Sequence, residues 1–196
     1  MSDLAPEVLL PLLEGRLGRP YRFVEECEST QRLVRGEDPE GATIACDVQT
    51  AGRGRLGRTW LAPPRKALLF SVQLRPLPPM PLWPELSLVA GEAVAAALRR
   101  TTGLRAELGH PNDVLVAGRK LVGVLPEAVP GRVVLGIGVN VNQTADELPP
   151  ETPKPPSSLL LETGREWERA PLLAAILLEL EQGYDAWQDA HAPRRR

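Results

Sequence analysis

A run of three glycines and three arginines, residues 52–58, is the segment of this sequence best suited to hold an anion. Glycine lets the backbone adopt unusual conformations and bring its amides close to an anion, and arginine adds planar cations that suit carboxylate or phosphate oxygens. The spacing of Gly52, Gly54 and Gly57 also matches the dinucleotide-binding glycine pattern, but no helix follows it, and the position about 20 residues further on is Leu77 rather than an acid. We expect an anion-binding loop; a solvated surface turn and an arginine-rich nucleic-acid segment are the alternatives.

Lys120, at the start of an apolar strand, is one of only three lysines in the chain, the others being Lys66 and Lys154. Its stem either carries the ammonium group to solvent or points into a pocket, where the ammonium would act as a fixed positive charge. Residues 111–113 (Pro-Asn-Asp) precede it and form either an ordinary turn or part of a site. Both segments are therefore candidate ligand contacts.

Two more segments place polar groups where regular structure begins or ends. Residues 136–142 (Gly-Ile-Gly-Val-Asn-Val-Asn) put glycines inside an apolar strand, which marks a bulge or the close approach of a ligand or another backbone. Asn140 and Asn142 share one face of that strand, either as strand-end turn residues or as ligand contacts. Residues 29–31 (Ser-Thr-Gln) open a helix, where capping explains the hydroxyls and where the free amides can also bind a ligand.

The composition narrows the function classes. The 196 residues are 43% apolar and 24% charged, which are ordinary values for one globular domain. A net charge of −2 disfavours a generally basic nucleic-acid binder, although twenty of the 23 basic residues are arginine. Cys27 and Cys46 lack the spacing of a zinc site or a disulfide scaffold, and no secretory signal or bilayer-spanning run is present, so we expect a cytoplasmic protein. No Ser-His-Asp or Cys-His set emerges, so a protein nucleophile has no candidate.

Hydrophobic periodicity and turn residues predict a mixture of helices and strands. The expected helices are residues 6–14, a short helix after Thr30 that stops at Gly36, residues 85–100 and residues 171–187. The expected strands are residues 43–49, 67–74, 105–108, 114–116, 121–125 and 132–141. These strands follow one another as hairpins, which predicts an α+β fold. We also expect a loop at 143–158, a half-buried strand position for His110, and a frayed end at 193–196.

Taken in order, these pieces resemble the biotin protein ligases. The segments that carry the resemblance are residues 28–31 (Glu-Ser-Thr-Gln), 49–60 (Gln-Thr-Ala-Gly-Arg-Gly-Arg-Leu-Gly-Arg-Thr-Trp), 111–114 (Pro-Asn-Asp-Val), 118–123 (Gly-Arg-Lys-Leu-Val-Gly) and 136–140 (Gly-Ile-Gly-Val-Asn). The order and spacing hold over residues 25–190. As a set these motifs are highly specific, whereas each one alone is not.

The resemblance implies the fold related to class II aminoacyl-tRNA synthetases, a mostly antiparallel sheet backed by helices. It implies a catalytic domain over residues 1–190 and a basic tail at 191–196, with neither the family's C-terminal β-barrel nor its N-terminal helix-turn-helix, and hence no DNA partner. The implied reaction joins biotin to ATP, with Mg²⁺, to give biotinyl-5′-AMP and pyrophosphate. Biotin then passes to a lysine of the biotin carboxyl carrier domain of acetyl-CoA carboxylase. No membrane partner is expected, and the protein would be a monomer or homodimer.

Two alternatives remain within the resemblance: a biotin-binding homologue with little or no activity, and a lipoate or octanoate transferase of the same fold. The family usually has Lys or Arg followed by Trp directly before Pro-Asn-Asp, whereas this chain has Gly109 and His110. A ligand titration and a pyrophosphate-release assay separate these functions.

The resemblance also implies roles for individual residues. Catalytic roles fall to Lys120, Arg53 and Arg55, which would neutralise a carboxylate and a polyphosphate as they approach each other. The residues expected to bind biotin are Ser29, Thr30, Gln31, Gln49, Arg53, Gly54, Arg55, Lys120 and Gly123. The residues expected to bind ATP are Arg53, Arg55, Arg58, Trp60, Asn112 and Asn140. No residue is expected to bind a metal directly.

Overall fold

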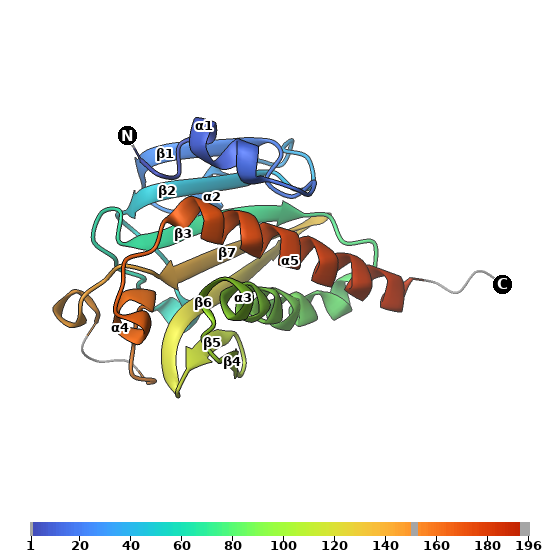
Figure 1. Cartoon of the computed structure of the whole chain (residues 1–196). Helices are drawn as coiled ribbons and strands as arrows, with labels where there is room; N and C mark the ends of the chain where they lie inside the picture. Colours follow the sequence, from blue (N-terminus) through green and yellow to red (C-terminus); the bar gives the residue numbers. More distant parts are fainter. Residues whose placement is uncertain (1, 150–152, 193–196) are drawn as a thin grey trace.

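One mixed sheet runs through the molecule (Figure 1). The computed structural model describes residues 2–149 and 153–192. Within them the strands lie side by side in the order β1 (Tyr21–Cys27), β2 (Thr43–Gln49), β3 (Ala67–Leu74), β7 (Arg132–Asn140), β6 (Arg119–Val129), β5 (Asp113–Val116) and β4 (Ala106–Gly109). β1 and β2 are parallel, and the other neighbouring pairs are antiparallel. The predicted α+β class with a mostly antiparallel sheet is therefore confirmed.

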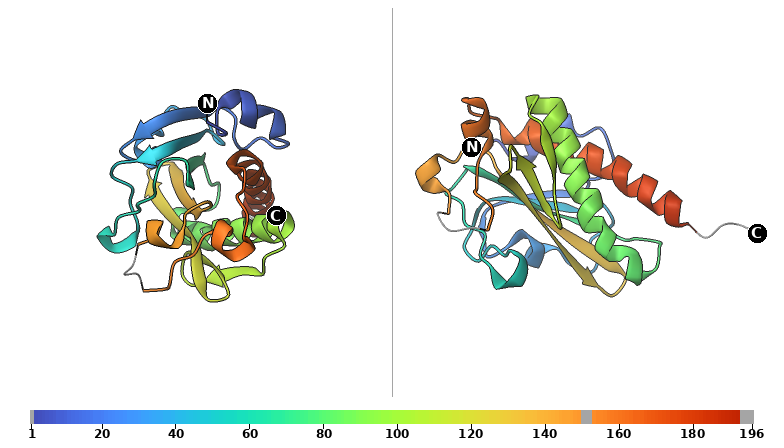
Figure 2. Two further views of the ribbon diagram at one scale, coloured as in Figure 1. Left: turned by 60° about the vertical axis from the view of Figure 1, so that its left-hand side comes forward. Right: turned by 90° about the horizontal axis from the view of Figure 1, so that it is seen from below.

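Two long helices cover one face of this sheet (Figures 1 and 2). α3 (Leu86–Thr102) and α5 (Arg169–His191) pack against each other and against a core that includes Phe70 of β3 and Ile137 of β7. Because side chains alternate along a strand, the residues between these core positions face the opposite side of the sheet. Among the described residues no long helix covers that side, and the candidate site lies there.

The end of α3 follows directly from the sequence. Alanine and leucine, which are strong helix formers, occupy much of its length. Gly103 adopts a left-handed conformation with φ 74° and donates its amide to the carbonyl of Arg99, which closes the helix. The predicted helix at 85–100 with a glycine stop is therefore confirmed.

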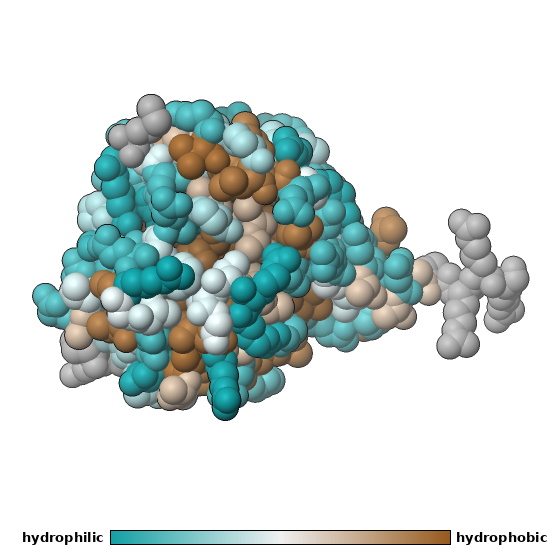
Figure 3. Space-filling view, viewed as in Figure 1, coloured by the Kyte–Doolittle hydropathy of each residue, from teal (hydrophilic) through white to brown (hydrophobic). Residues whose placement is uncertain are grey.

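The remaining described helices are short. They are α1 (Pro6–Leu9), α2 (Thr30–Leu33) and α4 (Leu159–Thr163), with 3₁₀ segments at Leu10–Leu12, Arg55–Gly57, Met80–Glu85 and Ala145–Glu147. None of the described helices is long and apolar enough to cross a membrane. The face drawn in Figure 3 is mostly hydrophilic, with smaller apolar patches between the charged side chains.

A buried arginine ties α5 and the N-terminal segment to the sheet. Arg169 is only 1% exposed, and its guanidinium binds the carboxylates of Asp3 and Asp47. The Nη2–Oδ1 distance to Asp47 is 2.7 Å, and Nη1 donates to the carbonyl oxygen of Ala67 at 3.1 Å. Removing Arg169 would leave Asp3 and the buried Asp47 without this shared cation, so Arg169 holds the start of α5 and the N-terminal segment against the sheet.

Several predicted element boundaries were wrong. The sequence does not predict β1, because β1 is an edge strand whose side chains are mostly half-buried, so its apolar residues do not alternate clearly. α2 ends before Gly36, because the backbone of Val34 is already extended at φ −74° and ψ 120°. α4 falls inside the predicted loop, since five residues are too few for periodicity, although Ser158 caps its start and Gly164 ends it.

Other boundaries lie further out than predicted. β6 continues past Pro126. Proline has no backbone amide to donate, but β5 pairs with β6 only as far as Gly123, so no hydrogen bond to β5 is lost at Pro126. α5 extends beyond the predicted 171–187 at both ends. His110 lies exposed in the turn between β4 and β5 and is not a half-buried strand residue, which corrects that prediction. Residues 193–196, predicted to fray, lie outside the described residues.

Candidate functional site

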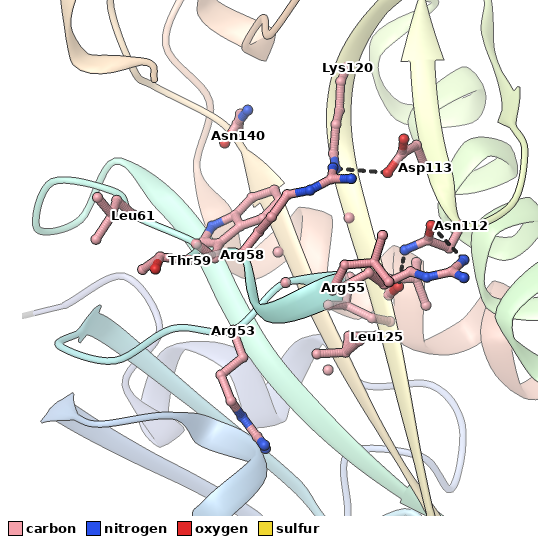
Figure 4. Close-up of a pocket in the computed structure, with 18 of the residues that line it drawn as sticks. Arg53, Arg55, Arg58, Thr59, Leu61, Asn112, Asp113, Lys120, Leu125 and Asn140 are labelled. Atoms are coloured by element: carbon pink, nitrogen blue, oxygen red, sulfur yellow. Dashed lines mark hydrogen bonds and ion pairs between the residues drawn. The ribbon is translucent and has the colours of Figure 1, made fainter. Parts of the chain in front are cut away.

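Every residue predicted to bind biotin or ATP lies on the wall of one cavity. Figure 4 labels six of them: Arg53, Arg55, Arg58, Asn112, Lys120 and Asn140. The cavity has a volume of about 630 Å³ and lies on the sheet face opposite α3 and α5. Strands β6 and β7 form its floor, and the start of α2 and the end of β2 close one end. The loop after β2 forms a further wall, and the turn at 109–113 together with residues 153–156 forms the other end. The structure thus brings the predicted residues together, while their individual roles stay predictions.

Glycines of β6 and β7 make room for two side chains on the cavity floor. A Cβ atom at Gly138 or at Gly123 would lie 2.7 Å from the ring of Trp60. A Cβ atom at Gly136 would lie 2.6 Å from the Gln31 side chain. These separations are far shorter than the optimal carbon–carbon contact. The glycines inside β7 therefore serve the close approach of side chains from elsewhere in the chain.

Hydroxyl and amide groups meet at the end of the cavity where α2 starts. Thr30 Oγ1 lies 2.7 Å from Ser71 Oγ of β3, and the backbone amide of Thr30 donates to Gln49 Oε1 at 2.9 Å. Ser29 occupies the N-cap position, but its side chain makes no capping hydrogen bond to the described backbone. Capping by Ser29 therefore does not explain its hydroxyl, and the hydroxyl and amide groups gathered here can serve a neutral polar ligand as donors and acceptors.

The loop after β2 folds back on itself and lays Trp60 against the floor. Trp60 donates its backbone amide to the carbonyl of Gly52 at 2.9 Å, and Gly54 donates to the carbonyl of Arg58 at 2.7 Å. A Cβ atom at Gly52 would lie 2.4 Å from the carbonyl oxygen of Trp60. Gly52 is therefore required for the closure of this loop, independently of any bound anion.

The three arginines of the loop point in different directions (Figure 4). Arg53 points away from the cavity centre and forms a bidentate ion pair with Glu127 of β6, with N–O distances of 3.0 and 2.8 Å. Arg55 donates from Nη1 to Asn112 Oδ1 at 3.3 Å, and Arg58 points across the cavity toward the start of β6. Arg53 would therefore have to leave Glu127 to contact a ligand in the cavity.

Two lysines share one carboxylate at the far end of the cavity. Nζ of Lys120 lies 2.8 Å from Asp113 Oδ1, and Nζ of Lys154 lies 2.8 Å from Asp113 Oδ2. Nζ of Lys120 also lies 5.7 Å from the centre of the Trp60 ring, within the range of a cation–π contact. Of the two orientations that the sequence allows for Lys120, the structure has the one that enters the pocket. Sequence reasoning placed Asp113 in a candidate segment without giving it a role, and it missed Lys154, although the scarcity of lysine was a signal for Lys154.

The two asparagines predicted to face the nucleotide are buried and held by the backbone. Asn112 donates from Nδ2 to a carbonyl of β6 at 2.6 Å, and Asn140 donates from Nδ2 to the carbonyl of Ser157 at 3.0 Å. Asn142 lies outside the cavity lining, and its side chain binds the backbone of Trp167. Of these two asparagines, only Asn140 therefore lines the cavity, whereas Asn142 binds the backbone of the segment that follows β7.

The cavity wall is strongly cationic. Among the described residues that line it, the charged side chains are Arg53, Arg55, Arg58, Lys120, Lys154 and Asp113. Since the whole chain has a net charge of −2, positive charge is concentrated here. Nε1 of Trp60 is buried and finds no hydrogen-bond partner among the described residues. The cavity can bind a polyanion at its cationic end and a neutral polar group beside α2.

Known proteins resemble this chain over much of its length. The family model for the biotin/lipoate A/B protein ligase family matches residues 25–143. A bifunctional ligase/repressor BirA of Bacillus spizizenii is 36% identical in an alignment of 187 residues, and the match covers 91% of this chain and 58% of that protein. A biotin–[acetyl-CoA-carboxylase] ligase of Mycobacterium tuberculosis is 38% identical in an alignment of 165 residues, and the match covers 82% of this chain and 60% of that protein. The chain thus spans less than two thirds of the length of these curated relatives.

A solved structure extends the comparison to the fold. The biotin protein ligase from Aquifex aeolicus in complex with biotin and ATP superposes with a TM-score of 0.78 and 35% sequence identity. The match covers 86% of this chain and 72% of that chain. The family match, the curated relatives and the shared fold together show that this chain belongs to the biotin/lipoate A/B protein ligase family.

Proposed function

We propose that this chain activates biotin with ATP and passes the activated biotin to a lysine of a carrier protein. The observation that carries this proposal is the gathering of five cationic side chains and one carboxylate around a single cavity in a chain of this family. Such a cavity suits a reaction in which a carboxylate approaches a polyphosphate, because their like charges must be neutralised. The names of the relatives, which describe biotin ligases, support the same substrates.

In the first step a carboxylate oxygen of biotin attacks the α-phosphorus of ATP. A bond forms between them, the bond to the β-bridging oxygen breaks, and pyrophosphate leaves with that electron pair. Lys120 would hold the biotin carboxylate and the α-phosphate oxygens, and Arg55 and Arg58 would contact the phosphates. Arg53 would join them after exchanging Glu127 for the ligand. Removing one preorganised contact of this kind costs about 3 kcal/mol of transition-state stabilisation.

Biotin's neutral ring system carries N–H and C=O groups, and the polar end of the cavity offers partners for both. Ser29, Thr30, Gln31 and Gln49 lie there, and we propose that they bind this head group. Gly54 and Gly123 also lie on the cavity wall, and we keep the proposal that both contribute to biotin binding; at Gly123 the ring of Trp60 lies over the backbone.

The nucleotide would occupy the cationic end. Asn112 and Asn140 lie on its wall, and we keep the proposal that both face ATP. We keep the proposal that Trp60 packs near the adenine, with its ring on the cavity floor beside the Lys120 ammonium group.

In the second step the amine of a carrier lysine attacks the carbonyl carbon of biotinyl-5′-AMP. An amide bond forms, AMP leaves with the electron pair of the broken C–O bond, and the amine loses its proton to solvent. Because both nucleophiles belong to substrates, the protein has no need to supply one. We propose the biotin carboxyl carrier domain of acetyl-CoA carboxylase as the acceptor, supported by the name of the mycobacterial relative, and the cytoplasm as the place of the reaction.

Magnesium would enter as part of the MgATP substrate. Both oxygens of Asp113, the one carboxylate of the described lining, are engaged by lysines. No group of three or more His, Cys, Asp or Glu side chains in the described part of the chain is arranged to hold a metal ion. Mg²⁺ is commonly held by substrate phosphates and water with one or two carboxylates. The phosphates of ATP therefore supply its main ligands in this proposal.

In the decisive experiment the purified protein is incubated with biotin, MgATP and a carrier domain, and the mass of the carrier is measured by mass spectrometry. We expect the carrier to gain one biotinyl group, and we expect pyrophosphate release that depends on biotin. A carrier whose acceptor lysine is replaced by arginine is the matched control and should gain nothing. Absence of both pyrophosphate and mass gain would refute the proposal, and pyrophosphate without mass gain would refute its second step.

Lipoate or octanoate is a second candidate substrate, because the matching family model includes lipoate proteins. Titration of the protein with biotin, lipoate and octanoate separates the candidates, and tighter binding of a fatty acid than of biotin would favour a transferase. A biotin-binding homologue with little activity is a further alternative. Robust biotin-dependent pyrophosphate release would reject it.

A further inference from the structure

Gln143 is fully buried behind the cavity wall and is not part of the cavity lining. Its Oε1 accepts the backbone amide of Val141 at 2.8 Å, and its Nε2 donates to Oδ1 of Asn140 at 2.8 Å. Ser158, which is also fully buried, donates from Oγ to the carbonyl oxygen of Gln143 at 2.6 Å. The backbone and the side chain of Gln143 are therefore both held, and the side chain ends on a residue that lines the cavity.

The hydrogen bonds of this group can run in only one direction. A backbone amide can only donate, so Val141 fixes the oxygen of the Gln143 side chain and turns its nitrogen toward Asn140. A backbone carbonyl can only accept, so Ser157 fixes the nitrogen of the Asn140 side chain, which donates to it at 3.0 Å. A flipped Asn140 amide would place a donor against the donor of Gln143 and an acceptor against the carbonyl of Ser157. The orientation of the Asn140 amide is thus fixed.

This fixed orientation matters because Asn140 is 5% exposed and lines the cavity (Figure 4). The last torsion of an asparagine side chain is soft, so the amide has no strongly preferred plane of its own. Hydrogen bonds within the described part of the chain use one of its two N–H donors and one of its two lone pairs. The other donor and the other lone pair keep fixed directions before any ligand arrives.

The same hydrogen bonds continue to the start of β6. Ser157 accepts from Asn140 through its carbonyl and donates its amide to the carbonyl of Lys120 at 2.8 Å. Lys120 donates its own amide to the carbonyl of Pro155 at 2.8 Å. Gln143, Asn140 and the backbone of Lys120 therefore belong to one continuous set of hydrogen bonds at this end of the cavity.

We propose that Gln143 is a positioning residue for nucleotide binding, which touches no substrate and acts by fixing the amide of Asn140. This inference rests on the proposed function, in which Asn140 faces ATP. An amide that is already fixed loses little rotational freedom when the nucleotide binds, so binding is tighter. In the described part of the chain these hydrogen bonds do not reach the polar residues beside α2, so biotin binding should not depend on Gln143.

The test is a double-mutant cycle of Gln143→Met and Asn140→Ala, in which calorimetry measures MgATP and biotin affinity separately. Methionine is close to glutamine in size but has no N–H to donate to Asn140. We expect Asn140→Ala to weaken MgATP binding about tenfold and Gln143→Met alone about fourfold, which corresponds to a lost and a misdirected hydrogen bond. In the Asn140→Ala background Gln143→Met should have no further effect, because the residue through which it acts is absent. Biotin affinity should stay the same throughout.

Asn142→Ala is the matched control. The Asn142 side chain also makes two hydrogen bonds, both to the backbone of Trp167 at 2.9 Å, but it lies outside the cavity lining. Asn142→Ala should lower Tm and leave MgATP affinity unchanged. If Gln143→Met does the same, Gln143 has only a structural role and the inference is overturned. A loss of MgATP affinity that is equally large with and without Asn140 would also overturn it.

A second measurement needs only the folded wild type. Nitrogen-15 relaxation reports the motion of the Asn140 side-chain amide, whose signal is the one that Asn140→Ala removes. We expect this amide to be as rigid as the backbone of β7 before MgATP is added. An amide that rotates freely without MgATP would overturn the inference, even if Gln143→Met does not fold.

The inference and the proposed function fail in different ways. A wild type that transfers biotin while Gln143→Met behaves like Asn142→Ala refutes the inference alone. A wild type that shows the expected cycle in MgATP binding but transfers no biotin refutes the proposed function alone. A wild type that binds no MgATP refutes both.

Discussion

Replacing Lys120 with alanine should remove most of the proposed activity and leave the fold almost intact. Lys120 and Asp113 have side chains that are 24% and 12% exposed, so their ion pair is partly shielded from solvent. Asp113 keeps Lys154 at 2.8 Å in the variant, so no carboxylate is left unpaired. A pair of this kind contributes up to about 1 kcal/mol. We therefore expect Tm to fall by roughly 2–4 °C.

The effect on adenylate formation should be far larger. In the proposed first step the Lys120 ammonium group contacts oxygens whose charge is redistributed in the transition state. Loss of one preorganised electrostatic contact costs about 3 kcal/mol, which lowers the rate roughly 150-fold at 25 °C. In Lys120→Ala the loss of transition-state stabilisation should therefore exceed the loss of folding stability by about 2 kcal/mol or more.

The assay measures biotin-dependent pyrophosphate release at saturating MgATP, alongside thermal unfolding of the same preparations. Lys66→Ala is the control, because the Lys66 side chain is 32% exposed and lies outside the cavity lining. A rate of pyrophosphate release within threefold of the wild-type rate would show that Lys120 has no role in the mechanism. A fall in Tm of 10 °C or more, on the order of several kcal/mol, would show that Lys120 acts through the fold instead.

Three further variants test the packing and the buried polar groups. Gly138→Ala should displace the Trp60 ring, since the new Cβ would lie 2.7 Å from it, and tryptophan fluorescence and biotin affinity should both change; an unaltered spectrum would contradict the packing. Arg169→Met should lower the free energy of unfolding in urea by about 3 kcal/mol, because the buried carboxylate of Asp47 loses its buried cation and keeps only the half-exposed Arg65 at 3.3 Å. Burial raises the pKa of the Tyr184 hydroxyl above its ordinary value near 10, so this group stabilises the fold below about pH 10 and loses that contribution as pH rises further. Tyr184→Phe should therefore flatten part of the alkaline fall in stability, and an identical pH profile would count against this assignment.

Elements with a continuous local pattern could be predicted from the sequence. β2 and β3 occur at the predicted 43–49 and 67–74, because both are almost fully buried and rich in apolar residues. The parallel pairing of β1 with β2 could not be predicted, since β1 has a mixed pattern and its partner lies beyond the intervening α2. Strand order depends on packing between distant segments, and local periodicity carries no information on it.

The sequence predicts which residues line the cavity, but it does not predict the directions in which their side chains point. The assigned residues all line the cavity because they belong to motifs whose order and spacing are specific as a set. Lys154 escaped prediction because it stands in a proline-rich loop without a motif, and only the fold brings it to Asp113. Arg53 was assigned a ligand contact, but in the structure it pairs with Glu127. Whether an arginine of the loop faces the cavity depends on a distant carboxylate of β6.

Arg53 and Lys120, two of the cations that line the cavity, differ in how firmly they are held. The Arg53–Glu127 pair is exposed, at 38% and 42% for the two side chains, so it contributes about 0–1 kcal/mol and an anion can displace it at little cost. Lys120 is instead fixed by a shielded carboxylate and by the face of Trp60. Positive charge near the expected reacting atoms is therefore in place before a ligand binds, where preorganisation has the largest effect on rate. The cavity thus combines a lysine held in place by its neighbours with an arginine, Arg53, that an anion can draw away from Glu127.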